Sequence, residues 1–554
     1  THTCTMISSL DVTSEGAARR SRRLAPPRNT ASMCMKPVGT TARCFMNVVL
    51  PLLCWFVAYV ASYLYYRNGP ITVPIVYVGD TVTVLDTLLG NDVVTIPDPL
   101  IFEAALKLQT PIVLRGTGVR SWGSYWGCGS GLKGLANLLP SRVKAMRSTG
   151  TVFSYMNKAP LHRESGSNFS WPNGSAAVRR ITLRPAALFA RLAKQDESSA
   201  EYVTLTQIIS GAASPALNAD IRYNERPVFY PDEAKEEEEI AKGKRTAGRM
   251  RVWIGRDTTT HTHVDESRNF YTQVCGRKRF VLWRPAAHRD LVLYPESHPG
   301  YRQAQRATAD IFDSISARPY VVTLWRGDTL YIPPLFFHRA IAMENNHSGF
   351  YAPEPISVSV NVWTESAVQR LKARLLRRGL APIATKACPR FGAKHNRSRV
   401  SDGAPCRAAL RQFVRDVVRA VVSSTADADA TAVNRFLRLD VLARWRGSEL
   451  RPCRAGPATP PLPPPRRSAK SRAHVAALAA EFRVDGLATP GGSSFLLPGA
   501  RQIVLADYVE IVARTALGAN AVCSFLESCV VDLAPNGGGE LLAQRASTSR
   551  TDDL

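Results

Sequence analysis

The pattern of apolar and polar positions divides this chain of 554 residues into three parts. Residues 45–66 form a run of 22 residues without a charge, which is long enough to span a bilayer as a helix. Between residues 269 and 363, short runs alternate apolar and polar positions, as β-strands with one buried face do. From residue 366 onward, apolar residues recur at helical spacing. The pattern predicts a membrane helix, a β-rich middle part and a helical C-terminal part.

The β-rich middle part has the strand pattern of a barrel. Residues 269–283 contain two strand-like runs that are interrupted at Gly276. Residues 326–334 form a turn that leads into a short apolar strand. Residues 356–363 alternate in the manner of strands that line a barrel. We therefore expect a mainly β domain between the membrane segment and the helices.

The C-terminal part is predicted to contain two groups of helices. Residues 366–380 form an Arg-rich helical run, and residues 407–422 carry five apolar residues at helical spacing, namely Leu410, Phe413, Val417, Val418 and Val421. A proline-rich stretch at 457–472 indicates an exposed linker. A further helical unit is expected from His474 to Leu533. We divide this part into a helical region, a linker and a second helical region with a polar tail, at 366–456, 457–473 and 474–554.

Two histidines and an aspartate form a candidate metal site. His263 and Asp265 are two residues apart, so on a β-strand both side chains point to the same face. With His338 from a second strand they form the facial triad of non-haem Fe(II) oxygenases, which leaves the opposite positions open. A structural hydrogen-bonded pair and a buried core histidine are the alternatives. His261 lies on the same strand face, and we interpret it as a solvated or supporting histidine.

The residues around this triad resemble a known family. Six motifs occur in order: Thr-x-x-His-x-Asp at 260–265, Asn-Phe at 269–270, Gly-Arg-Lys at 276–278, Leu-Tyr-Pro at 293–295, Gly-Asp-x-Leu-Tyr-Ile-Pro at 327–333 and Ser-Val-x-Val-Asn-x-Trp at 357–363. Together they resemble the cupin-type JmjC oxygenases, in the protein-hydroxylase branch that includes the asparaginyl hydroxylase of hypoxia-inducible factor. The resemblance implies a double-stranded β-helix, or jelly roll, with flanking helices. We place this domain at 70–365, with the barrel core at about 202–365.

The resemblance also implies a cofactor, a co-substrate and a set of contacts. Fe(II) would be held by His263, Asp265 and His338, and 2-oxoglutarate would be the co-substrate. Its far carboxylate would meet Lys278, Thr260 and Tyr202, while Asn269 and Asn361 would line the pocket. Lys278 alternates with Phe280 and Leu282, so all three are predicted to point into the barrel.

The implied reaction is hydroxylation of a protein side chain, with conversion of 2-oxoglutarate to succinate and CO2. An aspartate in the triad is more typical of the hydroxylase branch than of the lysine demethylases. Two other interpretations stay open: a JmjC lysine demethylase and a non-catalytic cupin-fold scaffold at a membrane.

The membrane segment predicts a location as well. The preceding residues 1–43 carry a strong excess of Arg and Lys, so the positive-inside rule places the N-terminus in the cytosol. Residues 44–66 would then be a single-pass signal anchor, with the catalytic domain in the lumen of the ER or Golgi. A cleaved signal peptide is the alternative.

Charge and cysteine content add little to this picture. A net charge of +26 is compatible with nucleic acid, an anionic membrane or acidic partners, but the arginines are scattered through Ala-rich helices. We therefore do not expect a nucleic acid partner. Eleven cysteines do not define the redox compartment, although Cys523 and Cys529 are a candidate pair or, alternatively, buried thiols on a helix. By resemblance, the C-terminal helices are expected to support a homodimer.

Overall fold

The computed structural model describes most of the β-rich part and the C-terminal helices. The described residues are 71–72, 75–77, 82–85, 93–96, 109–115, 126–128, 130, 132–154, 178–195, 199, 201–209, 214–223, 249–306, 318–343, 356–379, 404–422, 430–446, 469–483, 497 and 499–530. Residues 70–554 form one compact unit, separate from residues 1–69. The predicted anchor at 44–66 and the basic tail before it lie outside the described residues.

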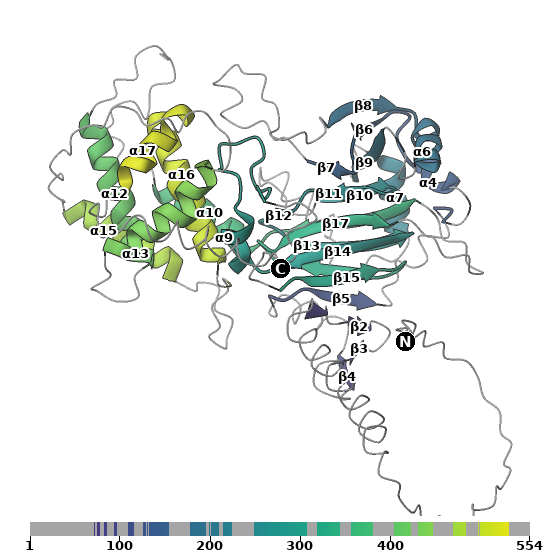
Figure 1. The fold of residues 1–554 in the computed structure, drawn as a ribbon. Helices are drawn as coiled ribbons and strands as arrows, with labels where there is room; N and C mark the ends of the chain where they lie inside the picture. Colours follow the sequence, from purple (N-terminus) through teal and green to yellow (C-terminus); the bar gives the residue numbers. More distant parts are fainter. Residues whose placement is uncertain are drawn as a thin grey trace, which may run out of the picture. The chain divides into compact units, whose positions relative to one another are not determined.

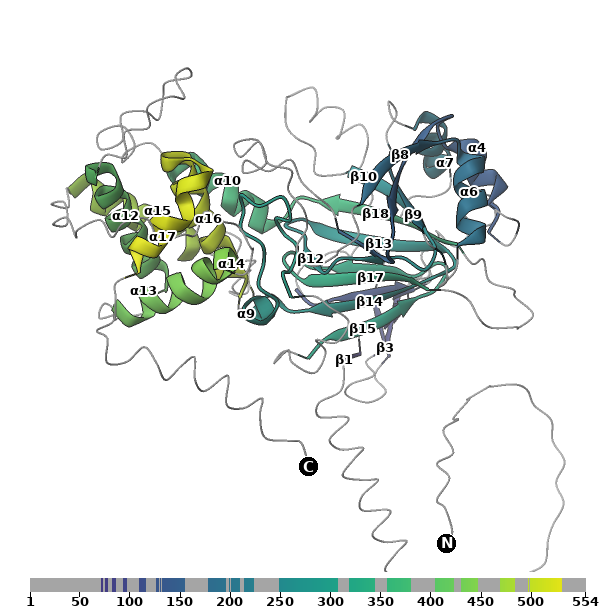
Figure 2. The same cartoon turned by 45° about the horizontal axis from the view of Figure 1, so that its top comes forward.

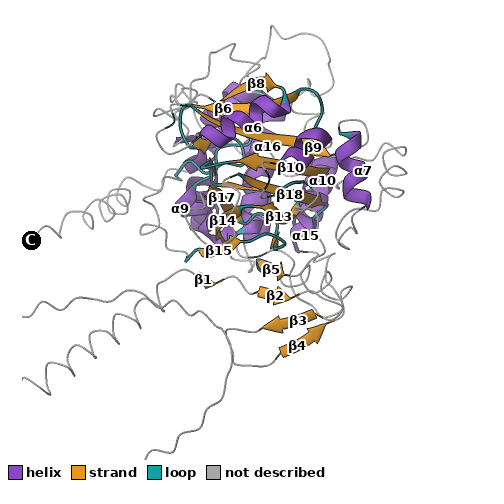
Figure 3. Ribbon diagram, turned by 90° about the vertical axis from the view of Figure 1, so that its right-hand side faces the viewer, coloured by secondary structure: helices purple, strands orange, loops and turns teal. Residues whose placement is uncertain are grey.

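Two largely antiparallel sheets form the β-rich part (Figure 1). The smaller sheet has the order β1 (Ile71–Thr72), β15 (Tyr320–Leu324), β14 (Arg277–Trp283), β17 (Phe337–Met343), β11 (Thr259–Thr260) and β7 (Val152–Phe153), and β12 (His263–Val264) pairs with β17. The larger sheet has the order β4 (Val93–Ile96), β3 (Val82–Leu85), β2 (Ile75–Tyr77), β5 (Ile112–Arg115), β16 (Thr329–Ile332), β13 (Arg268–Cys275), β18 (Ser357–Thr364), β10 (Arg249–Gly255), β9 (Tyr202–Ile209), β6 (Val143–Ser148) and β8 (Arg179–Leu183). Figure 3 shows these strands as one orange stack.

The barrel interior is an apolar core between the two sheets. Tyr271 and Leu330 of the larger sheet pack there with Phe280, Leu282 and Tyr320 of the smaller one. Side chains alternate between the two faces of a strand, so the neighbours of these residues point outward. The predicted mainly β, cupin-like fold with antiparallel sheets is therefore confirmed.

The outer face of the larger sheet carries a second core, which explains why β13 is buried along almost its whole length. Phe270 and Val274 of β13 point into this core, away from Tyr271. Three short helices cover it, namely α4 (Lys133–Leu138), α6 (Pro185–Lys194) and α7 (Pro215–Tyr223). Because both faces are covered, even polar residues of this strand, such as Thr272 and Gln273, are buried.

The C-terminal helices form the third apolar core. They comprise α10 (Ala367–Gly379), α12 (Ala404–Val422), α13 (Ala430–Phe436), the π-helix η4 (Leu437–Leu442), α14 (Ala443–Arg446), α15 (Ala469–Arg483), α16 (Ala500–Leu517), the 3-10 turn η6 (Ala519–Ala521) and α17 (Val522–Cys529). Figure 2 shows α12, α15, α16 and α17 grouped together. The C-terminal helical region is therefore confirmed, although α15 begins at Ala469, inside the predicted linker.

The helical core continues into the barrel. Trp283, Phe337 and Leu335 of the barrel belong to the same buried cluster as Phe413 and Val504 of the helices. The turn η2 (Pro285–Ala287) and the short helix α9 (His288–Leu291) lead from β14 into this cluster. The apolar stripe of α12 thus packs within the chain, and dimerisation through these helices stays a prediction.

One disulfide of the described region joins Cys128, ahead of α4, to Cys275 at the end of β13. The suggested pair Cys523 and Cys529 is wrong, because Cys523 is disulfide-bonded while Cys529 is a free, buried thiol. Both lie on α17, where a separation of six residues is about 9 Å along the helix axis and too far for a disulfide. The alternative of a buried thiol on a helix holds for Cys529.

Within the described residues, no single helix is long and apolar enough to cross a membrane. The bent pair of α16 and α17 meets the criteria of length and composition. Most of α16 is buried in the helical core, as expected for a central helix of a globular unit.

Candidate metal centre

The register of two short strands brings the three predicted ligands together. β12 pairs with β17 so that His263 lies directly opposite His338, and their ring centroids are 4.1 Å apart. Asp265 follows β12, and its Oδ2 is 3.7 Å from Nε2 of His338. The ligand atoms of all three side chains lie within 4.8 Å of one another. One metal ion can therefore contact all three.

Backbone contacts hold both imidazoles in the form that binds a metal. Nδ1 of His263 is 2.7 Å from the carbonyl of His261, and Nδ1 of His338 is 3.0 Å from the carbonyl of Phe336. Because a carbonyl accepts a hydrogen bond, each Nδ1 carries the proton and each Nε2 keeps a free lone pair. His261 supplies only its carbonyl and lies outside the group of three ligands.

The electrostatics of the site favour the same protonation states. Burial, with the neighbouring His338, lowers the pKa of His263 to about 3, so this imidazole is neutral at pH 7. Burial opposes ionisation of Asp265, but the two histidines and Arg302 outweigh it and lower the pKa of this carboxyl group. Neutral imidazoles and an ionised carboxylate are the donor set that a divalent transition metal requires.

A chain of side-chain hydrogen bonds fixes the Asp265 carboxylate. Its Oδ2 accepts hydrogen bonds from Nε1 of Trp363 at 3.0 Å and from Nδ2 of Asn269 at 3.5 Å. The Asn269 carbonyl accepts one from Nδ2 of Asn361 at 3.0 Å, and Asn361 accepts one from Nε1 of Trp253 at 2.7 Å. The structure therefore places both predicted asparagines, which are fully buried, behind the aspartate ligand.

The two tryptophans in this series of hydrogen bonds, Trp363 and Trp253, were not among the predicted site residues. Trp363 follows Asn361 by two positions on β18, so period-two alternation already puts both on one face. Trp253 lies on β10, and nothing in its local sequence indicates that its indole reaches Asn361.

A small cavity inside the barrel contains the predicted lysine. Lys278 is 6% exposed, and its Nζ donates a hydrogen bond to the Tyr271 hydroxyl at 2.7 Å. The other side chains around the cavity include Thr204, Trp253 and Thr260. Burial lowers the pKa of Lys278 to about 7. The prediction that Lys278 points inward with Phe280 and Leu282 is confirmed.

The tyrosine beside this lysine differs from the predicted one. Tyr202 is buried at the start of β9 and does not line the cavity, whereas Thr204 of the same strand does. Tyr271 takes the place next to the ammonium. Thr260 lines the cavity, and its hydroxyl oxygen accepts a hydrogen bond from the Ala340 amide at 2.9 Å.

The chemistry of these residues suits Fe(II) and a carboxylate ligand, while the cavity at Lys278 has a volume of only about 20 Å³. Among the described residues, no carboxylate forms an ion pair with Lys278. A buried ammonium without an anion is costly, so the cavity is suited to a ligand that brings one. The histidines and Asp265 match the donor set of non-haem iron.

A buried charge network joins the metal-bearing strand to the helices. Glu266, which follows the ligand Asp265, accepts a hydrogen bond from Lys372 Nζ of α10 at 2.6 Å. The same ammonium is 3.0 Å from Oδ2 of Asp507 on α16, and Arg444 is 2.6 Å from the other oxygen of Asp507. Burial alone would lower the pKa of Lys372, but the surrounding acidic groups outweigh it and raise the pKa.

The loop at residues 293–306, which pairs with β12, is held by α16. The Val264 amide donates a hydrogen bond to the Arg302 carbonyl at 2.9 Å, so residues 293–306 flank the metal strand. Glu510 of α16 accepts a hydrogen bond from the Glu296 amide of this loop at 2.6 Å. Glu296 of the loop is therefore bonded directly to α16, and Glu266 is linked to Asp507 of α16 through Lys372.

Comparison with known proteins agrees with this architecture. Residues 99–369 match the family model of the cupin-like domain. The chain is 30% identical over 125 residues to the tRNA wybutosine-synthesizing protein 4 of Gibberella zeae, covering 22% of this chain and 10% of that protein. It is 26% identical over 209 residues to the Jumonji C domain-containing protein 5 of Drosophila melanogaster, covering 36% of this chain and 46% of that protein. The chain thus spans less than half the length of either relative.

Proposed function

Because residues 99–369 of this chain form a cupin-like domain of the JmjC type, we propose that the protein is an Fe(II)- and 2-oxoglutarate-dependent dioxygenase. Its proposed reaction is hydroxylation of a side chain in a protein substrate. The observation that carries this proposal is the joint presence of the His263, Asp265 and His338 group and of the buried Lys278, which has no carboxylate partner among the described residues.

The chain's own residues would divide the work as follows. His263, Asp265 and His338 would hold the iron, and Lys278 with Tyr271 would bind the far carboxylate of 2-oxoglutarate. When bound, iron and 2-oxoglutarate supply the activation of dioxygen, with release of succinate and CO2.

The supporting residues keep this site in one arrangement. Asn269 and Trp363 hold the Asp265 carboxylate in place, which limits the reorganisation that metal binding requires. The apolar residues of the barrel interior around Lys278 exclude water, so its charge acts on the co-substrate with little screening.

Succinate release from 2-oxoglutarate by the full chain with Fe(II) tests the enzyme proposal. We expect His263→Ala to lose both bound metal and succinate release, and Lys278→Met to keep the metal but lose affinity for 2-oxoglutarate. His261→Ala is the matched control, because this neighbour contributes only its backbone carbonyl to the site. A chain that binds iron without turnover would instead support a non-catalytic cupin-fold scaffold.

Mass spectrometry of candidate protein substrates separates hydroxylation from demethylation. A hydroxylated product gains one oxygen atom, whereas a demethylated lysine loses a methyl group. The aspartate in the ligand set favours hydroxylation, by resemblance to the hydroxylase branch.

We also propose that residues 44–66 anchor the protein in a membrane and that the catalytic domain lies in the ER or Golgi lumen. The Cys128 to Cys275 disulfide supports this topology, because such bonds persist in oxidising compartments. Protease protection of intact microsomes tests it: a catalytic domain digested without detergent contradicts a luminal location. A luminal domain would not meet nucleic acid.

We also propose that the protein forms a homodimer through its C-terminal helices. Light scattering of the purified protein tests this.

A further inference from the structure

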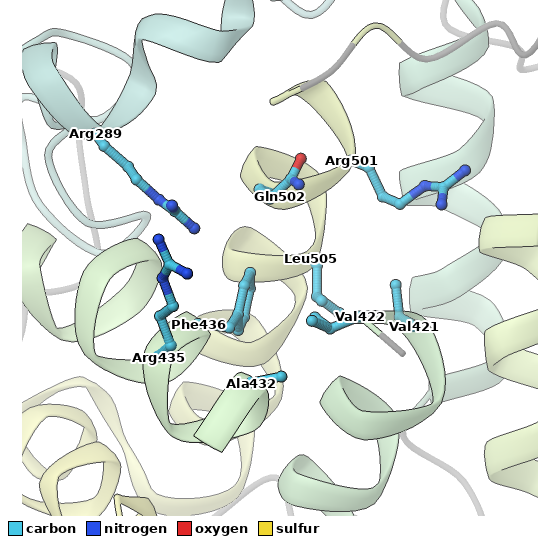
Figure 4. A pocket seen from close by; sticks show the side chains of 9 residues that line it. All are labelled: Arg289, Val421, Val422, Ala432, Arg435, Phe436, Arg501, Gln502 and Leu505. Carbon is cyan, nitrogen blue, oxygen red and sulfur yellow. The ribbon is translucent and has the colours of Figure 1, made fainter. Parts of the chain in front are cut away.

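A second pocket lies among the helices, apart from the residues of the metal centre. It has a volume of about 340 Å³ and is bordered by α9, α12, α13 and α16 (Figure 4). This volume falls in the range of cavities that bind small molecules, roughly 300 to 1,000 Å³. None of the proposed iron or 2-oxoglutarate contacts lines it, so it calls for a separate explanation.

The floor of the pocket is apolar. Val421, Phe436 and Leu505 line it and belong to the buried helical core, with exposed fractions of 8%, 2% and 1%. Val422 at the end of α12 also lines the pocket and is 37% exposed. An apolar group that enters the pocket would therefore cover Val422, the one of these four side chains with substantial surface open to water.

The rim of the pocket is cationic. Arg289, Arg435 and Arg501 all line it. Figure 4 shows the guanidinium groups of Arg289 and Arg435 pointing toward one another. Like charges repel, and an anion between them would relieve that repulsion. Guanidinium groups bind carboxylates and phosphates through paired N–H donors, so either head group suits this rim.

The positive charge of the rim is only partly neutralised by the protein. Asp440 accepts two hydrogen bonds from Arg289, each at 2.8 Å, and another from His288 at 2.7 Å. Within the described part of the chain, neither Arg435 nor Arg501 forms a hydrogen bond or an ion pair. The rim thus keeps two guanidinium groups that an anion can use.

We propose that this pocket binds an amphiphilic anion, with a carboxylate or phosphate head at the arginine rim and part of an apolar chain on the Phe436 and Leu505 floor. This site is independent of the oxygenase proposal. The same chemistry is offered by a free aliphatic carboxylate and by an acidic phospholipid, and the test distinguishes the two sources.

Isothermal titration of the full chain with octanoate tests the pocket directly. Acetate has the same head without the chain, and octyltrimethylammonium has the chain with the opposite charge. We expect both to bind at least about tenfold more weakly than octanoate, because each lacks one of the two complementary parts. Equal binding of acetate would overturn the role of the floor, and absence of octanoate binding would overturn the proposal.

Variants of the rim assign the binding to these residues. We expect Arg435→Gln and Arg501→Gln each to weaken octanoate binding about tenfold, the effect of losing one charge-assisted hydrogen bond. Arg438→Gln is the matched control, since Arg438 is exposed on the following turn and does not line the pocket. Circular dichroism verifies that the variants are folded. Equal affinity of the rim and control variants would overturn the proposal.

Two further experiments test whether the pocket is instead filled by a segment of this chain or binds a membrane lipid. Residues 423–429, between α12 and α13, carry Asp427 and Asp429 and lie outside the described residues. If octanoate binds only after Asp427→Asn and Asp429→Asn, the chain fills its own pocket and the proposal is wrong. Flotation with phosphatidate vesicles identifies the source: vesicle binding lost in Arg435→Gln together with octanoate binding indicates a lipid head group. Vesicle binding without octanoate binding indicates a charged surface and contradicts the pocket.

Discussion

The affinity of the protein for 2-oxoglutarate should depend on pH through Lys278. Burial lowers the pKa of this lysine to about 7, whereas the pKa of a lysine in an unfolded chain is 10.5. In the proposed complex the far carboxylate of 2-oxoglutarate would pair with the charged form, so the bound state would hold a proton that the free protein loses above about pH 7. Binding therefore takes up a proton, and raising the pH opposes it.

The size of the effect follows from the fraction of charged lysine. With a pKa of about 7, roughly half of the Lys278 side chains are charged at pH 7 and about one in ten at pH 8. The dissociation constant should then rise about fivefold from pH 7 to pH 8 and about tenfold more from pH 8 to pH 9. His263 does not contribute in this range, because its pKa of about 3 keeps it neutral.

Anaerobic calorimetric titration of the Fe(II)-loaded protein with 2-oxoglutarate measures this dependence. Performing it in two buffers of different ionisation enthalpy also gives the number of protons taken up. Lys278→Arg is the control, because a guanidinium stays charged and its dissociation constant should not change with pH over this range. A native protein whose affinity is constant between about pH 7 and pH 9 would refute the role assigned to Lys278.

Several other perturbations have expected outcomes. Trp363→Phe removes a hydrogen bond to Asp265 and should weaken Co(II) binding about 10- to 100-fold, measured by absorbance titration; unchanged affinity contradicts a positioning role. Lys372→Met leaves Glu266 without its ammonium partner, while Arg444 still pairs with Asp507, and it should lower the free energy of unfolding by about 3 to 5 kcal/mol in urea. Arg374→Met, which breaks a more exposed ion pair on the same helix, should cost at most about 1 kcal/mol, so equal losses would refute the network. Cys128→Ser should lower unfolding stability by about 2 to 5 kcal/mol under oxidising conditions only, and an equal loss under reducing conditions would exclude the disulfide as the cause.

The stability of the ligand-free protein should depend on pH in the opposite direction because of Lys278: it should rise with pH, whereas the affinity for 2-oxoglutarate should fall. Its pKa in the folded state is lowered, so the unfolded chain binds more protons between about pH 7 and pH 10.5. The contribution of this lysine to stability is therefore fullest above pH 10.5 and is lost as the pH falls toward 7. Lys278→Met removes the cost of the buried amine, and at pH 7 it should stabilise the ligand-free protein against heat while weakening 2-oxoglutarate binding. A residue kept at such a cost is typical of a binding site.

The metal ligands could be predicted because their geometry is local. Period-two alternation predicted that His263 and Asp265 lie close together, although β12 ends at Val264 and Asp265 follows it, and only the pairing with His338 needed the motifs of a known family. The inward orientation of Lys278 could be predicted for the same reason, since Phe280 and Leu282 on the same strand face are clear core residues.

The residues that sequence analysis missed act across sheets. Tyr271 contacts Lys278 because β13 of the larger sheet faces β14 of the smaller one across the barrel interior. Alternation from Asn269 would have placed Tyr271 on an inward face, but it cannot show which strand lies opposite. Tyr202 was selected from a weakly matching segment, and its strand β9 contributes Thr204 to the cavity instead.

Sequence analysis predicted the C-terminal helices as units separate from the barrel. Their packing against the barrel depends on contacts between residues far apart in sequence, which local patterns do not reveal. Lys372 reaches Glu266 over 106 residues and Asp507 over 135 residues. A chain that ended at residue 365 would therefore leave Glu266, next to the ligand Asp265, without its ammonium partner. It would also expose Trp283 and Phe337, which are buried in the shared core. The helices are thus part of the structure that holds β12, and the contacts that support the candidate metal site extend from β12 to α16.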